Sequence, residues 1–523
     1  MLNFERTFLS LFLLCSLLFS CSNDSETPED DSNPITDDEP IAVDETPPVI
    51  VLPQIPEILE VKTDLRFRIE DESDQVSTSI RLNGVEVFTS TEKDFVFTLN
   101  PFDYNIGSTK LEAVSSDFNE NENTQTLDFE LKKLLLRDPN PVNSLKNGVF
   151  VALNDSESKL IAYTKIETLD GVDFFADDSF EEQEMVYTKY SGASSEELDS
   201  RLFLTIDSFA NILPGTILPS KEEKVMPVGS PYSVKEISVS SNHTPNINSY
   251  NAQLLPDGLV DNSYSFNYVE ILNDQPDIMF SYPFGVDDID QYEYLFIEDY
   301  DQDTYEVDDF VKLESITSLS IPQGTGVFTL SVDGFYSEED YQNFRQHRVY
   351  YNRLDLSGLS GNTVNIPVIP EFEVFSKELN IDLVGNKTFT TVQKGVDSNF
   401  FIPDFDIEDN GDSIIFRGDH DYSTFGFLYQ DVFAGQIFVW VYNNSPTDAP
   451  LPIPFYGFEF PPEINTILSS QSIPTDVADI KENFRMASTM YKFQSPTDYF
   501  SMVFETQDFK NNRGDEYILR YNF

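Results

Sequence analysis

The sequence predicts an all-β, multi-domain protein made of β-sandwich modules. Aromatic residues make up 14% of the chain, with 45 Phe, 25 Tyr and a single Trp. Together with Val, Ile and Thr these residues favour strands, and turn-forming residues interrupt them about every 8 to 12 positions, as in sandwiches. At 523 residues the chain is too long for one hydrophobic core, so several domains are expected.

The chain begins with an apolar segment of the length of a targeting signal. Residues 9–20 are mainly apolar, and this run is shorter than the roughly 20 residues that a membrane-spanning helix needs. Residues 1–20 are therefore predicted to be a signal peptide.

A cysteine, Cys21, follows this apolar run directly. The sequence Leu18-Phe19-Ser20-Cys21 resembles the bacterial lipobox, although Phe19 departs from the small or aliphatic residue usual at its position. The resemblance implies that Cys21 is lipidated and becomes the mature N-terminus, which makes this a lipoprotein with a lipid contact to the membrane. The alternative is an ordinary cleaved signal peptide with an incidental cysteine.

Residues 21–48 are predicted to be a disordered acidic tether. They contain ten acidic residues and no Lys or Arg. So few large apolar residues cannot offset the entropy of ordering the segment. An acidic stretch after the lipidated cysteine also resembles the export signal of Bacteroidetes-type lipoproteins, which implies display on the outer face of the outer membrane. The alternative is a plain polar linker.

The charge of the whole chain excludes one class of partner. Lys and Arg total 32 against 92 Asp and Glu, which gives a formal charge of −60. Such a field repels phosphate backbones and anionic lipid, so no nucleic-acid partner is expected. Solubility, high external salt or divalent cations remain as explanations of the charge.

Residues 49–136 are predicted to be one sandwich domain. Leu65, Phe67 and Ile69 alternate with polar residues, which is the period of a half-buried strand. Further on, Asn83-Gly84 separates two alternating runs and predicts a type I′ hairpin. About seven strands are expected, and the segment resembles the bacterial Ig-like domains of surface proteins. Leu82–Val85, Phe95–Pro101, Gly107, Leu111, Ala113, Asp117 and Asn119 carry the resemblance.

The rest of the chain is divided into three β-rich modules, residues 137–281, 282–390 and 391–523. Segments around Glu378-Leu379-Asn380 and Glu463-Ile464-Asn465 match at an offset of 85 residues, so the last module is either a repeat of the preceding one or a chance match. Two short helices are expected, one capped by Ser337 and one over residues 476–486.

Common catalytic motifs are absent from the sequence. The three histidines, His243, His347 and His420, are far apart, and there is no H-E-x-x-H, nucleophile elbow or glycine-rich phosphate loop. His420 lies between Asp419 and Asp421, which suits either acid–base chemistry or, as we favour, an exposed turn. A pair of carboxylates for glycoside hydrolysis is not visible from sequence, so a hydrolase acting on polysaccharide stays open as an alternative.

One acidic loop is a candidate metal site. Its carboxylates are close in sequence to a turn-forming glycine, Gly411, and calcium prefers six to eight such oxygen ligands. The candidate ligands are Asp404, Asp406, Glu408, Asp409 and Asp412. No cofactor other than a structural calcium is expected, and a solvated loop is the alternative.

The order of segments resembles the surface glycan-binding lipoproteins of polysaccharide-uptake systems. That resemblance implies a non-catalytic binding module for glycans or another cell-surface ligand, with an outer-membrane transporter as a partner. Sugar-binding surfaces usually contain Trp, and the one Trp here, Trp440, is expected in a core strand. Tyr292, Tyr294, Tyr300 and Tyr305 are the substitutes available. A structural or adhesive cell-surface protein is the other alternative.

Overall fold

The computed structural model describes residues 44–141, 148–194, 202–219, 234–240, 255–260, 263–269, 277–281, 289, 292–297, 304–343, 345–356, 362–396, 399–431, 435–454, 457–470, 473, 484–493 and 514–523. The predicted signal, Cys21 and most of the acidic tether lie outside these residues. The described chain is a multi-domain all-β structure, as predicted, with two short helices, α1 (Glu338–Gln342) and α2 (Pro462–Ser470). Within it, no helix has the length and apolar character needed to cross a membrane.

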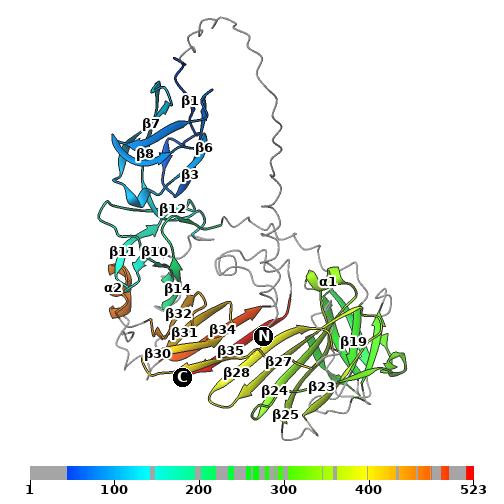
Figure 1. Ribbon diagram of the computed structural model, residues 1–523. Helices are drawn as coiled ribbons and strands as arrows, with labels where there is room; N and C mark the ends of the chain where they lie inside the picture. The colour runs from blue at the N-terminus through cyan, green and yellow to red at the C-terminus, as the bar shows by residue number, and fades with distance from the viewer. Residues whose placement is uncertain are drawn as a thin grey trace, which may run out of the picture.

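The first sandwich consists of two facing sheets at one end of the molecule, drawn in blue in Figure 1. Their strand orders are β1-β3-β6 and β2-β8-β7-β4-β5. The strands are β1 (Val49–Val51), β2 (Ile58–Leu59), β3 (Thr63–Glu70), β4 (Val76–Leu82), β5 (Val85–Ser90), β6 (Asp94–Leu99), β7 (Gly107–Asp117) and β8 (Glu122–Leu131), with a 3₁₀ turn at Pro101–Asp103. Leu65, Phe67 and Ile69 are buried in its core, which confirms the predicted alternation.

Asn83 and Gly84 form the turn between β4 and β5. Their φ angles are 50° and 80°, and Leu82 pairs with Val85. Positive φ at both central positions is the type I′ geometry, whose twist matches that of the two strands. The predicted hairpin is therefore confirmed.

A twelve-stranded sheet forms the largest part of the molecule (Figure 1). In spatial order its strands are β11 (Leu160–Ile166), β10 (Gly148–Asp155), β13 (Met185–Ser194), β14 (Leu202–Ile212), β32 (Gln436–Asn444), β31 (Tyr422–Asp431), β34 (Arg485–Phe493), β35 (Glu516–Asn522), β28 (Lys387–Lys394), β27 (Val374–Leu383), β24 (Val327–Phe335) and β25 (His347–Asp355). The pairs are antiparallel except β14 with β32, which is parallel. The alternating last segment of the chain forms the strand β35.

This sheet runs across the predicted module boundaries at 281/282 and 390/391. The parallel pairing of β14 with β32 places Ile206 beside Trp440, so segments more than 200 residues apart share one sheet. Two hydrophobic clusters lie against the sheet. One includes Trp440, Phe427 and residues of α2, and the other includes Leu330, Leu379 and Phe389.

Smaller sheets complete the described structure. They are β12 (Val172–Ala176), β9 (Lys133–Asp138) and β15 (Thr216–Ile217); β17 (Leu255–Val260), β18 (Ser263–Val269), β16 (Val234–Ser240) and β21 (Thr304–Tyr305); β19 (Asp277–Ser281), β20 (Glu293–Ile297) and β22 (Val311–Lys312); β23 (Ile316–Ser320) and β26 (Thr363–Pro367); and β29 (Phe405–Asp409), β30 (Ser413–Gly418) and β33 (Leu451–Pro452). A second 3₁₀ turn spans Val307–Asp309.

The two helix predictions have different outcomes. Ser337 caps α1 by accepting a hydrogen bond from the Asp340 amide at 3.1 Å, so this capping box is confirmed. Residues 476–483 of the second predicted helix lie outside the described residues, and Met486 belongs to strand β34. The helix α2 was not predicted, although Pro462 at its first position is a common helix start.

The two segments of the predicted repeat have different secondary structures. Glu378–Asn380 belongs to strand β27, whereas Glu463–Asn465 belongs to helix α2. The two segments that match at an offset of 85 residues therefore do not share a secondary structure: one is a strand and the other is a helix.

Candidate functional site

The predicted calcium-binding loop is a β-hairpin. Strand β29 contains Asp406, Glu408 and Asp409, and strand β30 begins directly after Asp412. Glycine at 411 has a φ of +88°, which suits the turn. Strand geometry sends neighbouring side chains to opposite faces, so the carboxylates do not all point toward one centre.

Two of these carboxylates bind cationic side chains instead. Lys387 donates to Asp406, and Arg417 forms a bidentate pair with Glu408 at 2.7 and 2.8 Å. The Arg417 pair holds the pKa of Glu408 below its ordinary value. Asp409 accepts a hydrogen bond from the Gly411 amide at 2.7 Å. The hairpin is therefore stabilised by its own ion pairs.

A different group of carboxylates is close enough together to hold a metal ion. Asp44, Asp71 and Asp117 each place an oxygen within 4.8 Å of the others, and they are the one such group among the residues that the structure describes. They lie at one end of the first sandwich, after β3, at the end of β7 and in the segment before β1. Three carboxylate oxygens supply part of the coordination that calcium needs.

Hydrogen bonds fix the geometry of this carboxylate group. Asp117 is buried and accepts bonds from the Asn119 and Asn121 amides, both at 2.8 Å, and from Asn121 Nδ2 at 2.7 Å. Burial raises the pKa of Asp117, but these bonds outweigh it, so the pKa lies below its ordinary value. Asn121 also donates to the Asp44 carbonyl at 2.8 Å, which binds the tether end to the sandwich.

Sequence reasoning did not find this group. Its three members belong to separate turns, and only the fold brings them together. In the sequence, the Asp117 and Asn119 pair of the Ig-like pattern is the one sign of this group, and that pair alone does not indicate a metal. An open cavity of about 480 Å³ beside the group is lined by Asp44, Glu72, Ser73, Asp74, Gln75, Phe118 and Asn119.

His420 lies in the connection between β30 and β31, as predicted, but it is not exposed. Its ring is buried, Nδ1 lies 2.9 Å from the Gly418 carbonyl oxygen, and the ring packs 6.1 Å from that of Phe416. The flanking carboxylates interact with Lys492 rather than with the imidazole, at 3.0 Å for Asp419 and 3.4 Å for Asp421. His420 therefore lies in a connection between strands, as predicted. The prediction that its side chain is exposed is wrong, because the core of the neighbouring hairpin covers the ring.

The single tryptophan is a core residue. Trp440 is fully buried in β32 and donates from Nε1 to the Ser208 hydroxyl at 2.9 Å, so the predicted core strand is confirmed. Tyr292 and Tyr294 are also buried. Tyr300 lies outside the described residues, and for Tyr305 only the backbone of β21 is described. None of the aromatic side chains described in this set offers an exposed sugar-binding ring.

The Arg513-Gly514-Asp515 tripeptide contains a carboxylate with a structural role. Asp515 accepts a hydrogen bond from the Lys394 amide at 2.7 Å and from the Tyr517 hydroxyl at 3.2 Å. Arg513 lies outside the described residues. Oδ1 of Asp515 therefore bonds to the end of β28, and Oδ2 bonds to a residue of β35.

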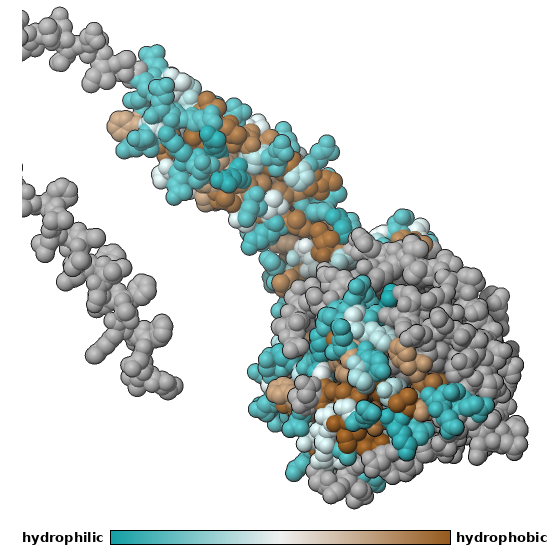
Figure 2. All heavy atoms as spheres, turned by 90° about the vertical axis from the view of Figure 1, so that its right-hand side faces the viewer, coloured by the Kyte–Doolittle hydropathy of each residue, from teal (hydrophilic) through white to brown (hydrophobic). Residues whose placement is uncertain are grey.

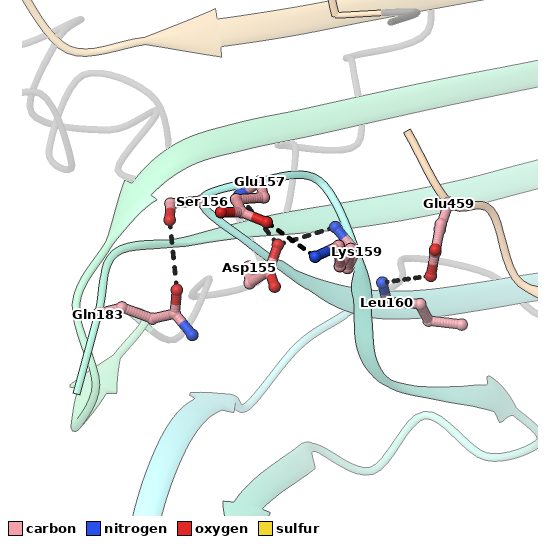
Figure 3. A network of polar contacts seen from close by, with 7 residues as sticks. All are labelled: Asp155, Ser156, Glu157, Lys159, Leu160, Gln183 and Glu459. Carbon is pink, nitrogen blue, oxygen red and sulfur yellow. Dashed lines mark hydrogen bonds and ion pairs between the residues drawn. The ribbon is translucent and has the colours of Figure 1, made fainter. Parts of the chain in front are cut away.

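A polar network joins the β10–β11 hairpin to a segment from the other end of the chain (Figure 3). Asp155 accepts bonds from the Glu157 and Lys159 amides at 2.9 and 2.8 Å, which stabilises the turn between β10 and β11. Glu459 accepts from the Leu160 amide at 3.2 Å, and its own amide donates to the Ser158 carbonyl at 2.9 Å. This network ties the β11 edge of the large sheet to the segment that precedes α2 and has no catalytic geometry.

Comparisons with known proteins gave no match to a family model and none to a characterised protein. Among solved structures, the chain is similar to the BSP domain of a biofilm-associated protein, at 15% identity over 31% of this chain and 29% of that chain, with a TM-score of 0.12. It is also similar to a Ca2+-stabilized adhesin that helps an Antarctic bacterium reach out and bind ice, at 7% identity over 86% and 96% of the two chains, with a TM-score of 0.14.

A third similar structure is a tetra-tandem repeat from the extending region of a large adhesion protein. Identity is 9% over 85% of this chain and 94% of that chain, with a TM-score of 0.13. At TM-scores this low, none of the three likenesses establishes a shared fold or function.

Proposed function

We propose that this chain is a cell-surface protein with an adhesive role, held at the outer face of the outer membrane by a lipid on Cys21. The observation that supports it best is the junction after the first sandwich. One residue, Lys132, separates β8 from β9, so the chain passes directly from one sheet into the next. A connection this short leaves little freedom between the two parts.

Hydrogen bonds and ion pairs stiffen the same junction. The amides of Lys132 and Leu134 donate to the carbonyls of Leu59 and Glu60 at 3.0 and 3.1 Å. Lys133 and Asp178 lie 3.6 Å apart, and Asp178 also accepts from the Ile106 amide at 2.8 Å. Figure 2 shows the first sandwich as a narrow projection from the larger body.

This arrangement suits display of a binding surface away from a membrane. A lipid anchor and an acidic tether come first, a rigid sandwich follows, and the large sheet region lies farthest along the chain. The proposed ligand lies outside the cell, and a glycan is the ligand class we favour. A structural calcium ion and an outer-membrane transporter partner are further parts of this proposal.

The proposal is tested in two steps. Labelling of intact cells with a membrane-impermeant reagent should reach the wild-type chain, and lack of labelling on intact but not lysed cells would contradict surface display. A glycan array probed with residues 21–523, with and without calcium, should then retain the chain on at least one glycan. A chain that is labelled on cells but retained on no glycan would keep the surface location and remove the ligand class.

A further inference from the structure

Two large apolar side chains are exposed in the connection between β28 and β29. Phe401 is 60% exposed and Ile402 is 40% exposed. We call these two residues the Phe401 surface. A single exposed apolar residue is ordinary on a protein, so the inference depends on how the backbone holds this one.

The residue before Phe401, Phe400, belongs to the hydrophobic core. Phe400 is buried in the cluster that contains Leu379 and Phe389, and Lys377 Nζ lies 5.2 Å from the centre of its ring. In an extended segment consecutive side chains point to opposite sides. Because Phe400 points inward, Phe401 points outward, and a register change that buried Phe401 would remove Phe400 from the core.

A buried glutamine fixes this register. The Gln393 side chain is 4% exposed; its Nε2 donates to the Phe401 carbonyl at 2.7 Å, and its Oε1 accepts from the Phe401 amide at 3.1 Å. The second donor of Nε2 reaches Thr391 Oγ1 at 3.0 Å, and Thr391 donates to the Glu516 carbonyl at 2.7 Å. Every polar group of this buried amide is satisfied, which is the condition for a rigid network.

The exposed ring also has an ordered aromatic neighbour. Phe401 and Tyr517 lie 5.5 Å apart between ring centres at an interplanar angle of 79°, an edge-to-face contact. The edge contact and the Gln393 bridge hold Phe401 in one orientation before any ligand arrives. A ligand that covers the ring therefore loses little side-chain entropy from the protein.

The surroundings of the ring indicate the class of ligand. Tyr517 donates to Asp515, Asp515 accepts from the Lys394 amide, and Lys394 pairs with Glu338 at 2.6 Å, so polar groups border the apolar ring. The formal charge of −60 disfavours anionic ligands. A neutral sugar ring has one apolar C–H face and hydroxyl groups at its edge, and it matches an isolated aromatic ring with a polar border.

We propose that Phe401 is the aromatic contact for a neutral glycan and that Gln393 is the residue that positions it. This inference rests on the proposed binding function and names the residue and the ligand class that serve it. Covering a Phe side chain is worth roughly 1.5–3 kcal/mol, and each 1.4 kcal/mol is a tenfold change in Kd. Loss of the ring should therefore weaken binding about tenfold or more.

The test uses residues 21–523 and a panel of neutral polysaccharides, with Kd measured by calorimetry for the polysaccharide that binds wild type best. Phe401→Ala should bind about tenfold more weakly or worse, and Phe401→Tyr, which keeps the ring, should bind like wild type. The control is Phe203→Ala, because Phe203 is 46% exposed on β14 and four strands of the sheet separate β14 from β28. Gln393→Leu should weaken binding with the ring still present.

The outcomes separate the inference from the proposed function. Unchanged binding by Phe401→Ala, or an equal loss in Phe203→Ala, would overturn the role of Phe401 and leave the binding function intact. Wild type that binds no neutral polysaccharide while cells displaying it still attach to surfaces would overturn the ligand class alone. Absence of both binding and attachment would overturn the proposed function as well. Equal melting temperatures for wild type and Phe401→Ala ensure that a loss of binding is not a loss of folding.

Discussion

Arg137 and Glu60 form an ion pair between the first sandwich and the sheet that follows it, with Nη1 2.6 Å from Oε1. Arg137 also forms a bidentate pair with Asp173 at 2.8 Å for both bonds. Hydrogen bonds from Arg137 to Asp173 and Glu60 raise its pKa above its already high ordinary value. One guanidinium therefore links the segment between β2 and β3 to strands β9 and β12 and fixes the angle at which the first sandwich leaves the body.

Removing the Glu60 carboxylate should loosen the junction between the first sandwich and the sheet that follows it. In Glu60→Gln, the charged contact to Arg137 is lost while Arg137 keeps Asp173, so the cost to stability should be small, about 1 kcal/mol or less. Hydrogen exchange of the Leu134 amide, which donates to the Glu60 carbonyl, should accelerate because the junction opens more often. In the control Asp173→Asn this amide should exchange as in wild type, and equal acceleration in both variants would contradict the account.

Removing a buried carboxylate near the same junction should cost more stability than Glu60→Gln does. Asp138 is buried and accepts from the Tyr187 hydroxyl and from Lys189 Nζ, both at 2.7 Å. Asp138→Ala leaves these two groups without the carboxylate, so the free energy of unfolding should fall by about 3 kcal/mol. Denaturant-induced unfolding of wild type and of Asp138→Ala measures this difference in free energy.

The matched control for Asp138 is an exposed pair. Glu157 and Lys159 lie 2.8 Å apart with side chains 73% and 61% exposed. Glu157→Ala should leave the unfolding free energy close to that of wild type, because solvent screens an exposed pair. A cost as large as that of Asp138→Ala would show that burial is not the deciding factor.

The single tryptophan gives a direct probe of the large core. Trp440 is fully buried, so its fluorescence should resist quenching by acrylamide until the sheet unfolds. Ser208→Ala removes the hydroxyl that accepts from Trp440 Nε1 and should cost about 1 kcal/mol. Ready quenching in the native protein would contradict the packing of the indole against Phe427, Phe458 and Phe460.

Local features of this fold could be predicted because neighbouring residues determine them. Asn83-Gly84 requires positive φ at two adjacent positions, and Ser337 caps a helix through a residue three positions later. Both signals are complete within a few residues. The alternation of Leu65, Phe67 and Ile69 likewise needs only one strand.

The remaining features depend on contacts between distant segments. Nothing near Ile206 indicates that it pairs with Trp440, because parallel strands need a long crossover with no local signature. The carboxylates of Asp44, Asp71 and Asp117 converge only after the sandwich has formed. Conversely, Asp406 and Glu408 are close in sequence, but strand geometry and the cations Lys387 and Arg417 give them separate partners.

The expected calcium ion can be tested by melting. Calcium added to chelated protein should raise the melting temperature, since an ion that binds only the folded state stabilises it. Asp117→Asn should abolish the rise if the first sandwich binds the ion, and Asp406→Asn should abolish it if the β29–β30 hairpin does. An unchanged melting temperature in wild type would contradict a structural calcium at either place.

The first sandwich should lose stability in acid. The folded pKa of Asp117 lies below the unfolded value of about 3.9, because its hydrogen bonds outweigh burial. Its stabilising contribution is therefore present above about pH 3.9 and is lost as the pH falls through the lower folded value. Hydrogen exchange of β7 amides across this range should show a steeper loss of protection in wild type than in Asp117→Asn. Parallel profiles for the two proteins would contradict this assignment.

The most direct test of the central claim is attachment of intact cells to a polysaccharide-coated surface. Cells that produce the wild-type chain should attach more than cells that lack it, and cells that produce Cys21→Ala should attach no better than those that lack it, because the binding region would no longer be held at the surface. Equal attachment by all three strains, or full attachment with Cys21→Ala, would contradict a lipid-anchored adhesive protein.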